Sequence, residues 1–328
     1  MPFSSRHRRS PLASAGWLVA GLAGCSIAVA APFAYVPNQK SGSISVIDLS
    51  TDTVTRTLTA KGQLGKRLQA IDVSRDGKLL YVVDAEHNEL FAIDPSTDSV
   101  ARKVAIGDDV EGVRLSPSGD QLAVCAEGQN LVLLIDAKSF KVDARIPVKG
   151  RNPEHCEFTP DGKHVVTSNE GSDNLDVIDV ATRASTGVIA TSGHPRGAAF
   201  LPGGKQLYVA QESANKVDVI DFTARSKTLS IDTALRTAGL TITKDGKRIY
   251  AANGGAGSVS VIDPATNKVI KEIPVGKRPW NMALTPDGRK LYVANGRSNS
   301  VSVIDTGSLG VVKEIPVGEL PWGVVISP

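Results

Sequence analysis

The chain repeats itself with a period of about 42 residues, and this period limits its fold more than any other feature. An Ile-Asp step occurs seven times with spacings of 46, 42, 43, 42, 42 and 42, and its aspartates are Asp48, Asp94, Asp136, Asp179, Asp221, Asp263 and Asp305. A glycine-containing turn recurs in phase with it, at Asp76-Gly77, Ser118-Gly119, Asp161-Gly162, Gly203-Gly204, Asp245-Gly246 and Asp287-Gly288. Two markers in phase at one fixed period are typical of a propeller or a solenoid. We interpret the recurrent aspartate as structural, because Asp before a turn accepts backbone N–H groups two residues on.

A single repeat, residues 279–318, has the pattern of four short strands. We expect strands at 281–285, 290–294, 300–304 and 311–317. Asp287-Gly288 is predicted to be a two-residue hairpin turn, because both residues tolerate a positive φ. No window shows a 3.6-residue apolar period. The sequence therefore predicts an all-β fold, a seven-bladed β-propeller with four antiparallel strands per blade.

The two ends of the repeat region predict how the ring closes. Residues 33–36 match the second strand of a repeat, whereas residues 321–328 match a first strand. The C-terminal strand should therefore complete the blade that the N-terminus begins, which removes the free edges of an open array. On this interpretation residues 31–328 are a single domain.

Residues 1–30 are typical of a cleaved secretory signal peptide. Three arginines within residues 6–9 precede an apolar run over residues 12–31, and Ala28-Val29-Ala30 offers small residues for cleavage. An uncleaved anchor, a twin-arginine signal and lipidation of Cys25 are the alternatives. Each places the folded part outside the cytoplasm, and we predict a bacterial periplasm.

Two cysteines, Cys125 and Cys156, lie in apolar strand-like runs of the repeat region. An exported chain can pair two cysteines in a disulfide. We favour two buried free thiols, because both runs have the pattern of core strands.

The charge balance excludes a surface that is dominated by binding to a polyanion. Three of the 37 basic residues lie in the first 31 positions, where there is no acid, so 34 basic side chains balance 34 acidic ones in the remainder. Nucleic-acid binding needs an excess of Lys and Arg, so it is not expected. We expect a monomer without a membrane span after residue 31.

The repeat resembles a known propeller family. Tyr-Val-Ala-Asn at 292–295, Tyr-Ala-Ala-Asn at 250–253 and Val-Ser-Val-Ile-Asp at 259–263 and 301–305 are similar to the YVTN-type repeats. Among these, the chain looks most like the exported propellers associated with pyrroloquinoline quinone (PQQ)-dependent catabolism. The resemblance implies a fold and a setting, and it carries over no catalytic residue. PQQ is therefore a possible ligand, and the cofactor stays unassigned.

One position of the repeat points to a site at a mouth of the central channel. The first strand of a propeller blade is innermost, and the position seven residues before its turn varies strongly between blades. Variation of this kind is expected where packing does not dictate identity and loops carry function. The seven residues are Gln69, Glu111, Glu154, Arg196, Ala238, Trp280 and Trp322.

Within that region we select eight candidate residues for binding a ligand or a partner: Trp280, Trp322, Arg196, Arg236, Arg278, Glu111, Glu154 and His155. The tryptophans would stack on a planar ligand or anchor a partner, or else pack between blades. Arginines hold carboxylates, and PQQ carries three. No metal site is expected, and His155 and His194 are only weak candidates for metal ligands.

These features lead to a main functional hypothesis and an alternative. The main hypothesis is a non-catalytic periplasmic binding or scaffold protein, accessory to PQQ-dependent oxidation of alcohol-type substrates. Its partner would be a PQQ-linked dehydrogenase or a cytochrome. The alternative is a periplasmic enzyme, a lactone hydrolase or a redox enzyme, with its site at the same channel mouth.

Overall fold

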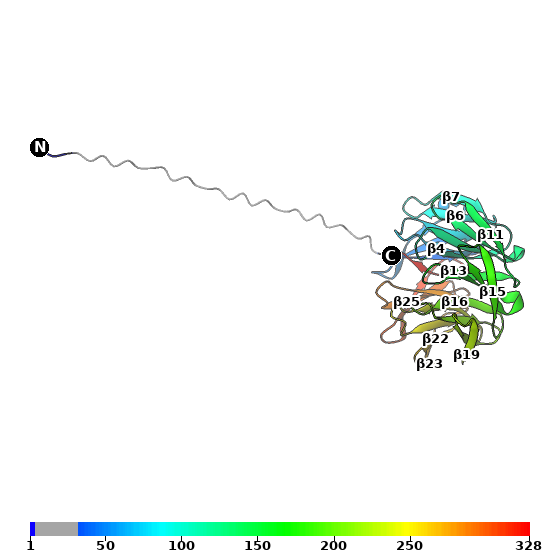
Figure 1. Ribbon diagram of the computed structural model, residues 1–328. Helices are drawn as coiled ribbons and strands as arrows, with labels where there is room; N and C mark the ends of the chain where they lie inside the picture. The colour runs from blue at the N-terminus through cyan, green and yellow to red at the C-terminus, as the bar shows by residue number, and fades with distance from the viewer. Residues whose placement is uncertain (4–31) are drawn as a thin grey trace. The chain divides into compact units, whose positions relative to one another are not determined.

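A computed structural model describes residues 1–3 and 32–328 of the chain. Residues 32–328 belong to one unit, in which seven four-stranded antiparallel sheets are arranged in a ring (Figure 1). This arrangement confirms the predicted seven-bladed propeller. Residues 4–30 of the predicted signal peptide, Cys25 among them, lie outside the described residues. Among the described residues, no helix has the length and apolar character that a membrane crossing requires.

Each blade runs from the channel outward through four strands. The first contains β28 (Val325–Ile326), β1 (Phe33–Asn38), β2 (Ser43–Asp48) and β3 (Thr53–Leu58). The second contains β4 (Leu68–Val73), β5 (Leu80–Asp84), β6 (Glu89–Asp94) and β7 (Ser99–Ala105). The third contains β8 (Val110–Leu115), β9 (Gln121–Ala126), β10 (Leu131–Asp136) and β11 (Val142–Pro147). The fourth contains β12 (Pro153–Phe158), β13 (His164–Asn169), β14 (Asn174–Asp179) and β15 (Ala184–Ala190). The fifth contains β16 (Pro195–Phe200), β17 (Gln206–Gln211), β18 (Lys216–Asp221) and β19 (Ser226–Asp232). The sixth contains β20 (Thr237–Ile242), β21 (Ile249–Asn253), β22 (Ser258–Asp263) and β23 (Lys268–Pro274). The seventh contains β24 (Pro279–Leu284), β25 (Lys290–Asn295), β26 (Ser300–Asp305) and β27 (Gly310–Pro316). Three short 3₁₀ turns occur in the described residues: η1 (Ala60–Gly62), η2 (Glu127–Gln129) and η3 (Glu170–Ser172).

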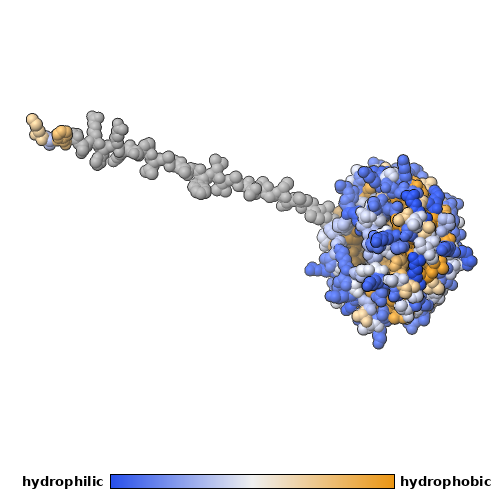
Figure 2. All heavy atoms as spheres, in the orientation of Figure 1, coloured by the Kyte–Doolittle hydropathy of each residue, from blue (hydrophilic) through white to orange (hydrophobic). Residues whose placement is uncertain are grey.

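The core lies between the blades. The second and third strands of a blade are buried on both faces, because each sheet packs against its two neighbours. The repeated tyrosines of the second strands, Tyr208, Tyr250 and Tyr292, are among the largest fully buried side chains. The outer strands alternate between exposed and partly buried residues, and the face drawn in Figure 2 is accordingly mostly hydrophilic.

The recurrent aspartate stabilises the turn before each outer strand. Asp48 Oδ1 accepts a hydrogen bond from the Ser50 backbone N–H at 2.7 Å, and Asp305 Oδ1 accepts one from the Ser308 N–H at 2.7 Å. Hydrogen bonds lower the pKa of both carboxyls. At Asp48 the donors are the hydroxyl and the N–H of Ser50, and at Asp305 the main donor is the N–H of Ser308. The structural interpretation of this aspartate is therefore confirmed.

The connection between the first two strands of a blade is longer than predicted. In the seventh blade the Thr285 N–H bonds to the Lys290 carbonyl, so four residues form the loop instead of two. Gly288 has a φ of +71°, and Asp287 is not among the residues with positive φ. Asp287 instead accepts hydrogen bonds from the Thr285 hydroxyl and the Arg289 N–H, which stabilises the longer loop. The predicted two-residue turn is wrong for this reason.

The ring closes as the sequence predicted, with a shorter final strand. β28 pairs with β1 through Val325 and Ile326, and the Ser327 N–H donates to the Phe33 carbonyl at 2.9 Å. Pro321 forms only an isolated bridge to Asn38. The pairing with β1 is therefore interrupted between Pro321 and Val325. The first strand of the seventh blade has a similar irregularity, where the register shifts between Pro279 and Met282.

The two cysteines of the repeat region form a disulfide that joins neighbouring blades. Cys125 lies on β9 and Cys156 on β12, and their Cα atoms are 6.1 Å apart. The expectation of two free thiols is wrong. Both residues are buried in core strands as expected, but the second strand of one blade packs against the first strand of the next, which brings the two sulfur atoms together.

Removal of this disulfide should destabilise the propeller measurably. The bridge closes a loop with a sequence separation of 31 residues, for which chain entropy predicts about 3–4 kcal/mol. We expect the double variant Cys125→Ala/Cys156→Ala to unfold at a lower urea concentration than the parent. Dithiothreitol should lower the midpoint of the parent and leave that of the double variant unchanged. Equal midpoints for parent and variant would contradict the prediction.

Candidate functional site

A polar cavity of about 350 Å³ lies where the inner strands begin, at one mouth of the channel. Five of its lining side chains are acids, two are arginines and two are tryptophans. The lining residues are Gln39, Gln69, Asp109, Glu111, Glu127, Glu154, Glu170, Arg196, Arg278, Trp280 and Trp322. Six of the seven variable positions identified in the sequence therefore line this cavity, together with Arg278.

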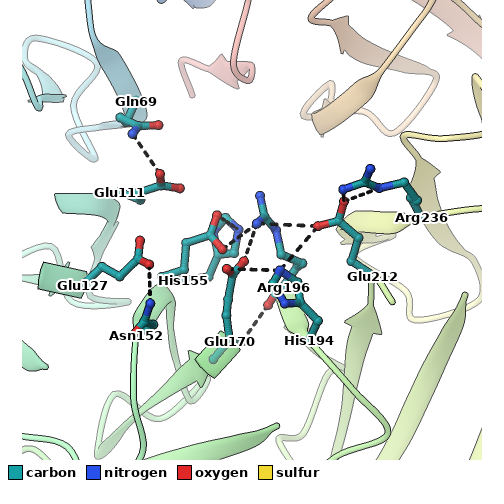
Figure 3. Close-up of polar contacts among 12 residues, drawn as sticks. Gln69, Glu111, Glu127, Asn152, His155, Glu170, His194, Arg196, Glu212 and Arg236 are labelled. Atoms are coloured by element: carbon teal, nitrogen blue, oxygen red, sulfur yellow. Dashed lines mark hydrogen bonds and ion pairs between the residues drawn. The ribbon is translucent and has the colours of Figure 1, made fainter. Parts of the chain in front are cut away.

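Arg196 on β16 lies at the centre of the charged groups (Figure 3). Its Nη1 atom is 2.7 Å from Glu154 Oε2, and it also donates a hydrogen bond to Glu170 Oε1. The Glu154 side chain is only 1% exposed, so Arg196 supplies the charge that makes burial of this carboxylate tolerable. Arg196 Nε has no hydrogen-bond partner among the described residues.

Glu212, which follows β17, organises the other two arginines. Its Oε1 atom accepts hydrogen bonds from Arg236 Nε at 2.8 Å and from Arg278 Nη2 at 3.0 Å. Burial alone would raise the pKa of Glu212, but the guanidiniums of Arg196, Arg278 and Arg236 outweigh it and lower that pKa. The three arginines therefore favour the ionised form of Glu212. Figure 3 shows its contact with Arg236.

Glu111 and Glu127 face the same opening and contact no arginine directly in the described part of the chain. Glu111 accepts a hydrogen bond from Gln69 at 3.0 Å, and Glu127 accepts one from Asn152 at 2.9 Å. Burial, with repulsion from Glu111 and Glu170, raises the pKa of Glu127 to about 7. Burial also raises the pKa of Glu111. When all groups are ionised, five glutamates face three arginines, an excess of two negative charges.

The two candidate histidines occupy different environments. Burial lowers the pKa of His155 well below its ordinary value, so this ring is neutral, and it lies 5.8 Å from the ring of Trp322. His194 Nε2 is 3.1 Å from Glu170 Oε2, and this contact raises the pKa of His194. The structure thus brings His194, and not His155, to a group of carboxylate oxygens that could hold a metal ion, together with Glu170 and Glu212.

The two tryptophans line the cavity in unequal ways. Trp322 is 8% exposed and packs in the largest core cluster, which agrees with packing between blades. Trp280 is half-buried, and the Arg278 guanidinium lies 5.6 Å from the centre of its ring. Trp280 therefore presents more of its ring to a ligand than Trp322 does.

Three functional side chains were missed in the sequence. Glu127, Glu170 and Glu212 all follow a second strand, at the position after the final residue of the Tyr-Val-Ala-Asn motif. The same position holds no acid in the other four blades, where the residues are Gln39, Ala85, Gly254 and Gly296. An alignment of the second strands, like the one made for the first strands, would have shown this acidic segment of three adjacent blades.

The comparisons with known proteins agree with the fold, and one of them is a partial match to a family of propellers. Residues 181–322 match the model of the family described as "Lactonase, 7-bladed beta-propeller". A comparison with curated proteins found no match.

Among solved structures, hydrazine synthase of Kuenenia stuttgartiensis is similar at 24% identity and a TM-score of 0.76, over 83% of this chain and 92% of that one. A functionally unknown protein from Desulfotomaculum acetoxidans is 16% identical with a TM-score of 0.79, over 90% and 98%. Dihydro-heme d1 dehydrogenase NirN in complex with DHE is 17% identical with a TM-score of 0.68, over 89% and 74%. At these identities the structures show a common fold alone.

The main functional hypothesis is wrong. A non-catalytic scaffold conflicts with the match of residues 181–322, because the matched family is named for a hydrolytic activity. The sequence reasoning looked for short catalytic motifs, whereas the charged groups of this site come one or two at a time from separate blades. The alternative hypothesis, an enzyme with its site at the channel mouth, agrees better with the match.

Proposed function

We propose that the protein is a lactone hydrolase whose substrate binds in the cavity at the channel mouth. One observation carries the proposal: a single cavity holds a carboxyl group with a pKa of about 7 together with partly buried arginine guanidiniums. The arginines of the site, with Glu212, lie inside the segment that matches the lactonase family. Of the two enzyme classes considered, this match supports the hydrolase.

The arginines suit the electrophilic half of lactone hydrolysis. Attack by water on the ester carbonyl places negative charge on the carbonyl oxygen, and preorganised N–H donors stabilise that charge. Arg196 makes its ion pairs through Nη1, so its guanidinium keeps other N–H groups for a carbonyl oxygen. Arg278, held by Glu212, lines the same cavity and offers a second cationic donor.

Glu127 suits the proton-accepting half. A general base works best when its pKa lies near the operating pH, and the pKa of Glu127 is about 7. In Figure 3 the Glu127 carboxylate points toward the opening that also contains Arg196. We assign Glu127 to take a proton from the attacking water and to return it to the ring oxygen of the lactone as the C–O bond breaks, so that this oxygen leaves as an alcohol and the carboxylic acid product ionises.

The variant Glu127→Gln should lower kcat for lactone hydrolysis by about 10²- to 10⁴-fold, because the amide cannot accept the proton. In the parent, activity should fall as the pH drops through about 7, since protonation removes the base; the variant should lack this acid limb. The rate is measured as the release of protons when neutral γ- and δ-lactones are hydrolysed to their hydroxy acids. Glu319→Gln, in an exposed loop of another blade, is the matched control and should keep parental activity.

The possible outcomes separate the function from the role of one residue. Hydrolysis that persists unchanged in Glu127→Gln would exclude Glu127 as the base and leave the function standing. A parent protein that hydrolyses no lactone of either ring size would exclude the function itself.

Export to a bacterial periplasm is part of the proposal. The Cys125–Cys156 disulfide supports it, because disulfides persist in oxidising compartments. The likeness to PQQ-associated propellers and the monomeric state stay predictions.

A further inference from the structure

Three side chains at the edge of the cavity bring one donor atom each toward a common point. His194 Nε2, Glu170 Oε2 and Glu212 Oε2 lie within 4.8 Å of one another. The histidine nitrogen is 3.1 Å from the Glu170 oxygen and 3.8 Å from the Glu212 oxygen. Ligands at 2.0–2.2 Å around a tetrahedral zinc ion lie roughly 3.3–3.6 Å apart. The donors are therefore close to the spacing that such an ion requires.

Both carboxylates divide their oxygens in the way that metal ligands do. The Oε1 atoms of Glu170 and Glu212 accept hydrogen bonds from arginines, from Arg196 at Glu170 and from Arg236 and Arg278 at Glu212. Outer partners of this kind orient a ligating carboxylate. The Oε2 atoms are turned toward His194 instead.

Arg196 is the arginine that forms an ion pair with one of the two Oε2 atoms. Its Nη1 atom is 3.6 Å from Glu212 Oε2, which is too long for a hydrogen bond. The same Nη1 atom donates a hydrogen bond to Glu170 Oε1 and lies 2.7 Å from Glu154 Oε2. The oxygens of the buried Glu154 accept no hydrogen bond within the described residues, so Arg196 is held by the ion pair with Glu154 as well as by Glu170.

The charge of the mouth favours a cation when all of its groups are ionised. Five glutamates and three arginines then leave an excess of two negative charges in a partly enclosed site. A divalent ion balances that excess. The imidazole nitrogen and the presence of only three protein donors suit Zn²⁺, since Ca²⁺ takes six to eight oxygen ligands.

We infer that Glu170, His194 and Glu212 bind a divalent ion of the zinc type, with an open position toward the cavity. This site lies beyond the proposed lactone hydrolysis and is tested by binding alone, so either proposal can fail without the other.

The test is calorimetric titration of ZnCl₂ into the full chain after treatment with a chelator, with CaCl₂ titrated in parallel. We expect one Zn²⁺ per chain and no comparable binding of Ca²⁺. His194→Asn should weaken Zn²⁺ binding by at least about 10-fold, because the loss of a direct ligand should cost no less than the loss of an outer partner. Asn tolerates the φ of +52° at this position, so the variant should keep its fold.

A matched control and a second variant keep the inference falsifiable. His87→Ala removes a histidine that also pairs with a carboxylate, Asp84, at 2.9 Å, and it should leave Zn²⁺ binding unchanged. Glu170→Gln should weaken Zn²⁺ binding as His194→Asn does. The inference would be overturned if the parent bound no Zn²⁺, or if Zn²⁺ binding survived both His194→Asn and Glu170→Gln. It would also be overturned if His87→Ala weakened Zn²⁺ binding as much as those variants do.

Discussion

A chain that ends at Pro321, without residues 322–328, should fail to form a stable propeller. The deletion removes β28, whose pairing with β1 closes the ring, and it removes the buried side chains of Trp322 and Val324. Lost apolar burial, the cavity between blades and the opened sheet edge together should cost about 8 kcal/mol or more, which is comparable with the whole stability of a domain. Exposed edges also promote aggregation.

Size-exclusion chromatography and far-UV circular dichroism test this expectation. The shortened chain should elute as aggregate or show no cooperative unfolding. A chain that lacks only the exposed Pro328 is the control and should behave like the parent. A truncated protein that elutes as a monomer with the parent's urea midpoint would show that the ring does not depend on this strand.

Arg196→Met should cause the largest loss of any single substitution at the site. Removal of the guanidinium leaves the buried Glu154 carboxylate without its partner, and breaking a buried ion pair in this way costs roughly 3–5 kcal/mol. The same variant should lower kcat for lactone hydrolysis by about 10²- to 10³-fold, because a donor to the carbonyl oxygen is lost.

The pH dependence of the loss identifies its cause. Without Arg196, burial raises the pKa of Glu154 above its unfolded value, so the folded variant retains a proton that the unfolded chain loses. The deficit in stability should therefore be smallest at low pH and grow as the pH rises above the ordinary pKa of glutamate. The double variant Arg196→Met/Glu154→Gln should recover part of it.

Urea unfolding over a range of pH measures these differences. Arg289→Met is the control, because its side chain is 85% exposed and its ion pair with Asp287 contributes little. A deficit that does not vary with pH, or one that the Arg289 variant shares, would show that the buried charge of Glu154 is not the cause.

The candidate site was predictable in part. Glu111, Glu154, Arg196, Trp280 and Trp322 all line the cavity, because the first strand of each blade places the same repeat position at the channel mouth. Glu127, Glu170 and Glu212 were missed, because they belong to a different repeat position, after the second strand. The pairing of Glu170 and Glu212 with arginines of other blades depends on where the loops meet, and no spacing in the sequence encodes that.

The sequence by itself determined the architecture of this protein. A 42-residue period with alternating β-forming residues leaves few ways to bury both faces of the strands, and the mismatched ends, 33–36 and 321–328, require closure between the termini. The tertiary structure alone decided the chemistry. Glu212 of the fifth blade meets Arg278, 66 positions away, because the loops before the first strands converge at the channel mouth. Cys125 meets Cys156 because neighbouring blades pack against each other. Burial at those contacts then fixes which carboxyls stay ionised, and burial is a property of the assembled ring.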